Sequence, residues 1–164
     1  MARILIVGGG ERACALTEEL VSAGHAVRIT TRSESRRGVI EAAGGECWIG
    51  TPDRIASLRY ALENVTIACW LLGSARGTRE ELAALHGSRL AFFCSQTIDT
   101  TVRGLIYEAA GTVDPDLLEL GADLVASTAA YNAIPLRILR ADPADGPAWR
   151  SQAHEAIGSL LSVL

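Results

Sequence analysis

The sequence predicts one doubly wound α/β domain over residues 1–164, with a parallel sheet of six strands in the order 3-2-1-4-5-6 and no separate substrate domain. Three observations carry this prediction. Short apolar runs alternate with helical patterns along the whole chain, a glycine-rich turn follows the first run, and no repeat, linker or low-complexity segment interrupts the alternation. Strands that alternate with helices require right-handed crossovers and a parallel sheet covered on both faces.

The first half of the chain contains four expected strands. They are short apolar runs bounded by turn residues, at residues 3–7, 26–31, 46–49 and 65–72. A helical pattern between the first two strands covers 11–23 and stops at Gly24. Ser33 is an N-cap for the next helix, which we expect to end near Ala43, before two glycines.

Two further helices in this half carry their own start signals. Thr51-Pro52 places a proline at the first helical position and opens a helix. Its inward residues are Ile55, Leu58 and Leu62. Residues 78–81 read Thr-Arg-Glu-Glu, a capping box that begins a long helical stretch toward Ile98. Residues 89–94 are also compatible with a strand, but we expect helix because the apolar pattern continues through them.

The second half continues the alternation with two strands and two helices. The strands are expected at residues 102–107 and 135–139. Asp114-Pro115 begins one helix, and Asp145-Gly146-Pro147 leads into the last one. The apolar side of the first helix is expected to carry Leu117, Leu120, Leu124 and Tyr131. The last helix has Trp149, Ala153, Ile157, Leu160 and Leu164 at helical spacing.

The charged residues restrict the classes of function. All 15 lysine-plus-arginine residues are arginine, which excludes a Schiff-base lysine, a phosphate-loop lysine and a proton relay through an ammonium group. The net charge is −4 and no basic run is long enough to hold a nucleic-acid backbone, so we expect no nucleic-acid partner. Residues 1–37 nevertheless carry six arginines against four acids, which suits a small anionic ligand.

The other composition signals are those of a cytoplasmic protein. The apolar runs fall far below the ~20 residues of a membrane span, and the start lacks the pattern of a signal peptide, so we expect no membrane partner. The four cysteines, Cys14, Cys47, Cys69 and Cys94, form no C-x-x-C pair, and we expect reduced, mostly buried thiols. The histidines have no metal-ligand spacing, and we expect His86 and His154 to be solvated and no metal to be bound.

Residues 8–13 form the motif with the clearest chemistry. Gly8-Gly9-Gly10-Glu11-Arg12-Ala13 matches G-x-G-x-x-A directly after the first strand and at the start of the first helix. In such a motif the first glycine permits the tight turn, the second lets the backbone approach a diphosphate, and the small third residue allows close helix packing. The helix N-terminus then meets the negative charge. Three glycines also fit a plain turn, but the position in the first βαβ unit favours dinucleotide binding.

The end of the second strand indicates which dinucleotide is bound. An Asp or Glu there usually binds the ribose 2′-OH of NAD, whereas this chain has Thr31 and Arg32. Arginine pairs with a phosphate through two hydrogen bonds, so we predict NADP(H) in preference to NAD(H), with Arg32 as the selecting residue and Arg36 one helical turn further on. Arg36 and Arg37 also fit a solvated helix surface. The missing acid argues against S-adenosylmethionine as well.

Several segments together resemble a known family. Residues 42–53, 57–65, 102–107 and 134–140 are similar to the corresponding stretches of atypical short-chain dehydrogenase/reductase proteins with a Rossmann fold, in the NAD-dependent epimerase/dehydratase-like and NmrA-like groups. This resemblance implies that Gly50 and Thr51 lie near the adenine, and that Leu72-Gly73-Ser74 lies near the diphosphate or the nicotinamide-side ribose. It also implies a homodimer through the helices on either side of the fifth strand.

The chain departs from this family where the family's proton relay stands. Active members place a serine after the fifth strand and a Tyr-x-x-x-Lys motif on the next helix, whereas this chain has Glu108-Ala109-Ala110-Gly111. Tyr131 is followed four residues later by Pro135, and a tyrosine with a pKa near ~10 is a poor base without a neighbouring cation. We therefore expect Tyr131 to pack on its helix, and Glu108 either to polarise a hydroxyl or to cap a turn.

Two functions remain compatible with these observations. The first is an NADP(H)-binding module without catalytic residues, serving in nucleotide binding or redox sensing. The alternative is a small atypical NADPH-dependent oxidoreductase, in which hydride transfer depends on positioning and water supplies the proton.

Overall fold

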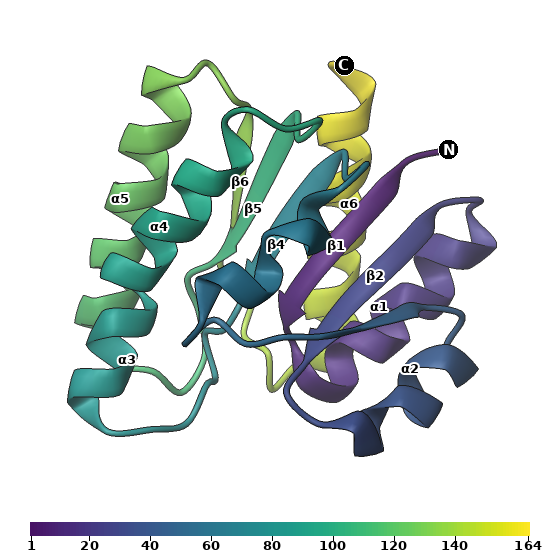
Figure 1. Cartoon of the computed structure of the whole chain (residues 1–164), viewed down its shortest axis with the longest axis horizontal. Helices are drawn as coiled ribbons and strands as arrows, with labels where there is room; N and C mark the ends of the chain where they lie inside the picture. Colours follow the sequence, from purple (N-terminus) through teal and green to yellow (C-terminus); the bar gives the residue numbers. More distant parts are fainter.

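The computed structural model describes all residues, 1–164, and contains one sheet of six parallel strands. The strands are β1 (Arg3–Gly8), β2 (Ala26–Thr31), β3 (Glu46–Ile49), β4 (Ile67–Leu71), β5 (Gly104–Glu108) and β6 (Leu136–Leu139). Their order across the sheet is β3-β2-β1-β4-β5-β6, so the predicted α/β fold and strand order are confirmed (Figure 1). The strand order reverses between β1 and β4. Both chain termini lie on the side of the sheet where the strands begin, away from the carboxyl ends of β1 and β4 (Figure 1).

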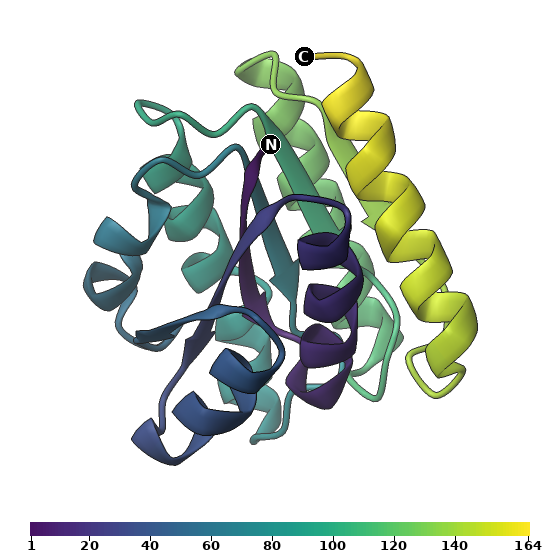
Figure 2. The same ribbon diagram turned by 90° about the vertical axis from the view of Figure 1, so that its right-hand side faces the viewer.

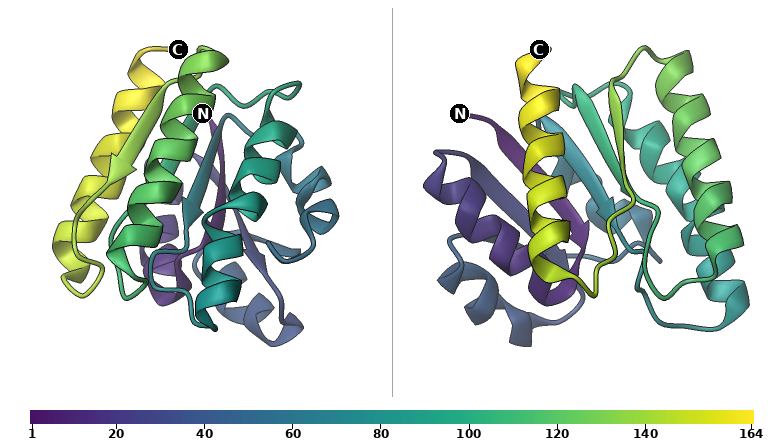
Figure 3. Two further views of the ribbon diagram at one scale, coloured as in Figure 1. Left: turned by 90° about the vertical axis from the view of Figure 1, so that its left-hand side faces the viewer. Right: turned by 180° about the vertical axis from the view of Figure 1, so that it is seen from behind.

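Helices cover both faces of the sheet (Figures 2 and 3). One face is covered by α1 (Gly10–Ser22), α2 (Arg37–Ala42) and α6 (Gly146–Ser162), and the other by α3 (Arg79–Leu85), α4 (Ser88–Thr97) and α5 (Pro115–Tyr131). Two apolar clusters result, because alternate residues of each buried strand point to opposite faces: Ile4 and Ile6 pack with α1 and α6, while Leu5 and Val7 pack with α4 and α5. No helix is both long enough and apolar enough to span a lipid bilayer.

The segment after β3 is not the α-helix that Thr51-Pro52 predicts. It forms two short 3-10 turns, η2 (Ile55–Leu58) and η3 (Tyr60–Leu62). Side chains from other segments occupy the carbonyl groups that an α-helix would use: Trp48 Nε1 donates to the Ser57 carbonyl at 2.8 Å, and Arg28 donates to the Ala61 carbonyl. The inward residues are nevertheless the predicted ones, since Ile55, Leu58 and Leu62 are buried.

The capping box at Thr78 is confirmed, but the long helix that follows it is divided in two. Thr78 Oγ1 accepts from the Glu81 N–H at 3.1 Å, and a Glu81 carboxylate oxygen accepts from the Thr78 N–H at 3.0 Å. The helix then ends at Leu85 and restarts at Ser88, because the backbone turns at Gly87. A Cβ on Gly87 would lie 2.6 Å from the Ala83 carbonyl oxygen, so this turn requires glycine.

The buried face of α5 also differs from the predicted one. The leucine spacing predicts Leu120 and Tyr131 on the inward side, but their exposed fractions are 64% and 91%. Leu117 is buried as predicted, and the rest of the inward face is formed by Leu118, Gly121, Ala122, Val125 and Ala129. A Cβ on Gly121 would lie 2.1 Å from the Tyr107 hydroxyl, so α5 lies too close to β5 to hold a side chain at this position.

Candidate functional site

A groove runs along the carboxyl ends of β1, β2 and β4, at the point where the strand order reverses. Its larger cavity is about 280 Å³ and is lined by the ends of these strands, by the loop after β3 and by one side of α3. A second cavity of about 230 Å³ lies over the glycine loop of residues 8–10 and shares Gly8, Leu72 and Ala75 with the first. In open α/β sheets this crevice is where ligands bind.

The glycine loop turns the chain from β1 into α1 beneath the smaller cavity. Gly8, Gly9 and Gly10 all have positive φ, at 89°, 84° and 55°. A Cβ on Gly8 would lie 2.5 Å from the Leu71 carbonyl oxygen, whereas one on Gly10 would meet nothing within 4 Å. The space above Gly10 is therefore open, and the first N–H groups of α1, which have no partner within a helix, adjoin it.

The motif's last residue, Ala13, has the packing role that the sequence predicts. Ala13 is fully buried, and a Cβ on Gly9 would lie 2.8 Å from the Ala13 Cβ. The Gly9 N–H donates to the Leu71 carbonyl at 2.8 Å, which fixes the loop against β4. Glu11 is exposed in the first turn of α1. The loop is thus held from both sides while its outer surface stays free.

Arg32, which directly follows β2, lies on the wall of the larger cavity. Its side chain is 68% exposed, and Nη2 lies 3.0 Å from Asp53 Oδ2. Thr31 and Gly50 line the same cavity, and the Gly50 N–H donates to the Thr31 carbonyl at 2.9 Å. Thr51 lines a neighbouring shallow cavity, which shares Arg32, Gly50 and Asp53 with the larger one.

Two other arginines near Arg32 differ in their surroundings. Arg37 pairs with Glu34 and Glu41 on the helix surface, which is the solvated position that the sequence leaves open. Arg36 is half-buried and is not part of either cavity wall. Sequence reasoning missed Arg76, an exposed residue after β4 that lines the larger cavity opposite β2. No motif marks Arg76; only its place in the loop that ends β4 could have indicated it.

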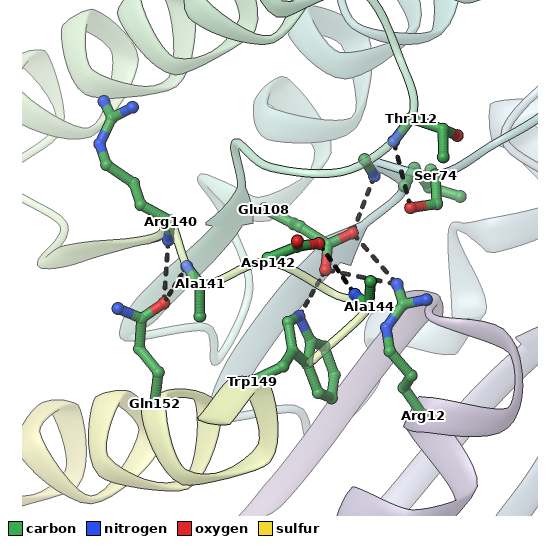
Figure 4. Close-up of polar contacts among 12 residues, drawn as sticks. Arg12, Ser74, Glu108, Thr112, Arg140, Ala141, Asp142, Ala144, Trp149 and Gln152 are labelled. Atoms are coloured by element: carbon green, nitrogen blue, oxygen red, sulfur yellow. Dashed lines mark hydrogen bonds and ion pairs between the residues drawn. The ribbon is translucent and has the colours of Figure 1, made fainter. Parts of the chain in front are cut away.

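Glu108, at the carboxyl end of β5, is enclosed by hydrogen-bond donors (Figure 4). It is 0% exposed, and it accepts from the Gly73 N–H at 2.9 Å and from Trp149 Nε1 at 2.6 Å. Arg12 Nη2 lies 3.4 Å from both carboxylate oxygens, and its guanidinium lies over the Trp149 ring, 5.0 Å from the centroid. Burial raises the pKa of Glu108, while the Arg12 guanidinium and the two N–H donors oppose this shift.

This arrangement replaces both roles that the sequence leaves open for Glu108. The carboxylate lines neither cavity of the groove and caps no helix; it joins α1, the loop after β4, and α6. Leu72 lines both cavities, but the Gly73 N–H is already occupied by Glu108. Ser74 lines the smaller cavity and accepts from the Thr112 N–H at 3.4 Å.

His86 is buried beneath the groove, so the prediction of a solvated position is wrong. Its exposed fraction is 2%; Nδ1 lies 2.7 Å from the Tyr107 hydroxyl and Nε2 lies 3.0 Å from the Leu72 carbonyl oxygen. Burial lowers the pKa of His86, which favours the neutral ring with the Nε2 proton donated to Leu72. The break between α3 and α4 turns the ring inward.

The remaining residues singled out in the sequence lie away from the groove. Tyr131 is the last residue of α5, which leads to the start of β6, so it lies near the amino ends of the strands and away from the groove. Its side chain is exposed and does not pack on the helix as predicted. His154 is exposed, with Nδ1 3.9 Å from Glu19. The four cysteines are free and buried, as predicted.

The comparisons with known proteins bear on the fold. No protein-family model and no curated protein matches the chain. Among solved structures, a short-chain dehydrogenase/reductase superfamily protein from Agrobacterium tumefaciens with bound NAD matches with a TM-score of 0.69 and 19% identity, over 84% of this chain and 48% of that one. The fold is that of short-chain dehydrogenases/reductases.

Two enzymes give similar matches. UDP-glucuronic acid 4-epimerase from Bacillus cereus in complex with NAD has a TM-score of 0.66 and 13% identity, over 84% of this chain and 55% of that one. Vestitone reductase from alfalfa (Medicago sativa) has a TM-score of 0.65 and 16% identity, over 85% and 56%. The chain thus spans about half the length of the structures that it matches.

Proposed function

We propose that this chain is an NADP(H)-binding module with no proton relay of its own. The observation that carries the proposal is the juxtaposition of the glycine loop and Arg32 on one groove at the carboxyl ends of β1 and β2. Proteins with this fold, including the Agrobacterium tumefaciens protein and the Bacillus cereus epimerase, hold NAD.

The glycine loop suits a diphosphate. The open space above Gly10 leaves room for the phosphates, and the free N–H groups of Gly10, Glu11 and Arg12 at the start of α1 supply donors. The positive end of the α1 dipole adds to the attraction. Gly8 and Ala13 keep the loop close to β4 and α1, so the phosphates need no rearrangement of the backbone.

Arg32 suits a 2′-phosphate on the adenosine ribose. Its exposed ion pair with Asp53 contributes no more than about 1 kcal/mol, so a phosphate can replace or share that partner. Arg76 adds a second cation to the wall of the same cavity. Gly50, Thr51 and the loop after β3 then border the adenine.

The absence of a relay rests on two positions and on the composition. Glu108 occupies the end of β5, Tyr131 lies at the far edge of the sheet, and the chain has no lysine. A small oxidoreductase remains the second candidate, because vestitone reductase shares the fold. In that case substrate turnover with NADPH should be detectable without any residue of this chain as proton donor.

The test is a calorimetric titration with NADPH and NADH. We expect NADPH to bind about tenfold more tightly, or better, and Arg32→Ala to remove most of that preference because a charge-assisted phosphate contact is lost. Arg37→Ala is the matched control, since Arg37 is bound to Glu34 and Glu41 outside the groove. An intact preference in Arg32→Ala would refute the selecting role, and no binding of either nucleotide at about 1 mM would refute the proposed function.

A further inference from the structure

A dinucleotide occupies two neighbouring mononucleotide sites on a doubly wound sheet, one over each half of the sheet. The fold consists of two mononucleotide-binding halves, here β1–β3 and β4–β6, and the ligand lies across the crevice between them. The two cavities of the groove are lined by the ends of β1, β2 and β4 and by the loop after β3. Neither cavity is lined by a residue of β5 or of the loop that follows it.

Backbone contacts between the loops after β4 and β5 close the mononucleotide site over the second half, β4–β6. The Gly73 carbonyl accepts from the Val113 N–H at 3.0 Å, so the loop after β4 is bonded to the loop after β5. The two loops lie so close that a Cβ on Gly73 would be 1.9 Å from the Ala110 carbonyl oxygen, and one on Gly111 would be 2.1 Å from the Gly73 carbonyl oxygen. No ring of a ligand fits between them in this arrangement.

Buried side chains fill the space beneath these loops. Glu108 is fully buried and Trp149 is 0% exposed, and both lie beside the Arg12 guanidinium (Figure 4). Opening this cluster would leave the Gly73 N–H, the Trp149 indole N–H and the Arg12 guanidinium without their acceptor. The second half is therefore occupied by the protein's own groups, and a nicotinamide riboside does not fit there.

We propose that the site takes the adenosine 2′-phosphate and diphosphate part of the nucleotide and leaves the nicotinamide end in solvent. This inference rests on the proposed function and narrows it: the site binds the nucleotide without reading the oxidation state of its nicotinamide ring. Arg32 and the glycine loop bind the 2′-phosphate and the diphosphate. The cluster of Arg12, Gly73, Glu108 and Trp149 fills the space that the nicotinamide riboside would need.

The experiment compares three ligands on the intact chain: NADP⁺, NADPH and 2′-phospho-ADP-ribose, which lacks only the nicotinamide. We expect their Kd values to agree within about fivefold, and Arg32→Ala to weaken all three by the same factor. Iodide should quench the emission of bound NADPH as effectively as that of free NADPH, because the ring stays in solvent.

The outcomes separate this inference from the function on which it rests. If NADP⁺ or NADPH binds more than about fivefold tighter than 2′-phospho-ADP-ribose, or if bound NADPH is protected from iodide, the nicotinamide is held by the protein and the inference is wrong while nucleotide binding stands. If none of the three ligands binds, the proposed function itself fails. Arg37→Ala should leave all three Kd values unchanged.

Discussion

The two halves of the sheet, β1–β3 and β4–β6, differ in how accessible the polar groups at their carboxyl ends are. At the ends of β1 and β2 the polar groups are accessible: Gly10 adjoins open space, and Arg32 lies exposed on a cavity wall with only an exposed ion pair to Asp53. Where the loops after β4 and β5 meet, the polar groups are already paired, with Glu108 accepting from three donors of the protein. We call these the open half and the closed half. One fold can thus keep one mononucleotide site accessible and fill the other with its own side chains.

The largest expected effect comes from breaking the closed half with Glu108→Ala. The substitution leaves the buried Gly73 N–H and Trp149 indole N–H without an acceptor and removes the carboxylate partner of the partly buried Arg12, which should lower the free energy of unfolding by about 4 kcal/mol. Urea unfolding measures the change. Glu119→Ala is the control, because Glu119 forms an exposed pair with Arg140 and should cost about 1 kcal/mol or less. Equal losses in the two variants would contradict a closed half held by Glu108.

Two glycine substitutions test the open half. Gly8→Ala combines a φ of 89° with a Cβ 2.5 Å from the Leu71 carbonyl oxygen, and should lower the free energy of unfolding by about 3 kcal/mol. Gly10→Ala adds a methyl group to empty space, so it should cost only about 1 kcal/mol, yet weaken NADPH binding about tenfold or more because the methyl group occupies the phosphate position. In unfolding and NADPH titration, Gly8→Ala should therefore show the larger loss of free energy of unfolding, and Gly10→Ala should show a loss of NADPH affinity at little cost in stability. Unchanged NADPH affinity in Gly10→Ala would place the phosphates elsewhere.

Arg12 lies at the boundary, since it lines the smaller cavity and also bonds to Glu108. If its side chain belongs to the closed half, Arg12→Met should lower the free energy of unfolding by about 2 kcal/mol, because the Glu108 carboxylate loses its only cation. NADPH affinity should change by less than about threefold, since the backbone N–H groups of α1 remain. A larger loss of affinity with little loss of stability would assign the Arg12 side chain to the open half.

The smallest effect concerns His86, whose Nε2 bonds to the Leu72 carbonyl between the two halves. Its pKa is lowered in the folded chain, so below a pH of about 6.5 the unfolded chain binds a proton that the folded chain does not. Its contribution to stability is therefore present above that pH and is lost as the pH falls, by at most about 1.4 kcal/mol per pH unit. Unfolding measured from neutral to mildly acidic pH should show a smaller slope for His86→Gln. An unchanged slope would assign the acid sensitivity to other groups, of which His25, also with a lowered pKa, is one.

Much of the fold follows from local sequence patterns. The bounds of β2 and β3 agree with the predicted strands to the residue. The alternation of strands and helices predicts a doubly wound parallel sheet, and the glycine motif together with the family resemblance predicts its strand order. The glycine loop and Arg32 could be placed on one groove because both follow strands that end at the same edge of the sheet.

The differences have a common physical cause, which is contact between segments distant in sequence. The helix expected after Thr51 becomes 3-10 turns because Trp48 and Arg28 bind its carbonyl groups. His86 is buried because Tyr107 and the Leu72 carbonyl hold its ring. Glu108 is a lone acid in the sequence, and its donors come from three separate elements that no local pattern brings together.

The contacts of Glu108 also have a consequence for the order of folding. They join it to residues 96, 35 and 41 positions away, so they form only after both ends of the chain have been brought to β5. Closing such long loops costs entropy before any contact compensates for it, which places the cluster late on the folding pathway. Substitutions at Glu108 should therefore accelerate unfolding while leaving the refolding rate nearly unchanged. The half of the sheet that excludes ligand would then be the part that sets how long the native chain survives.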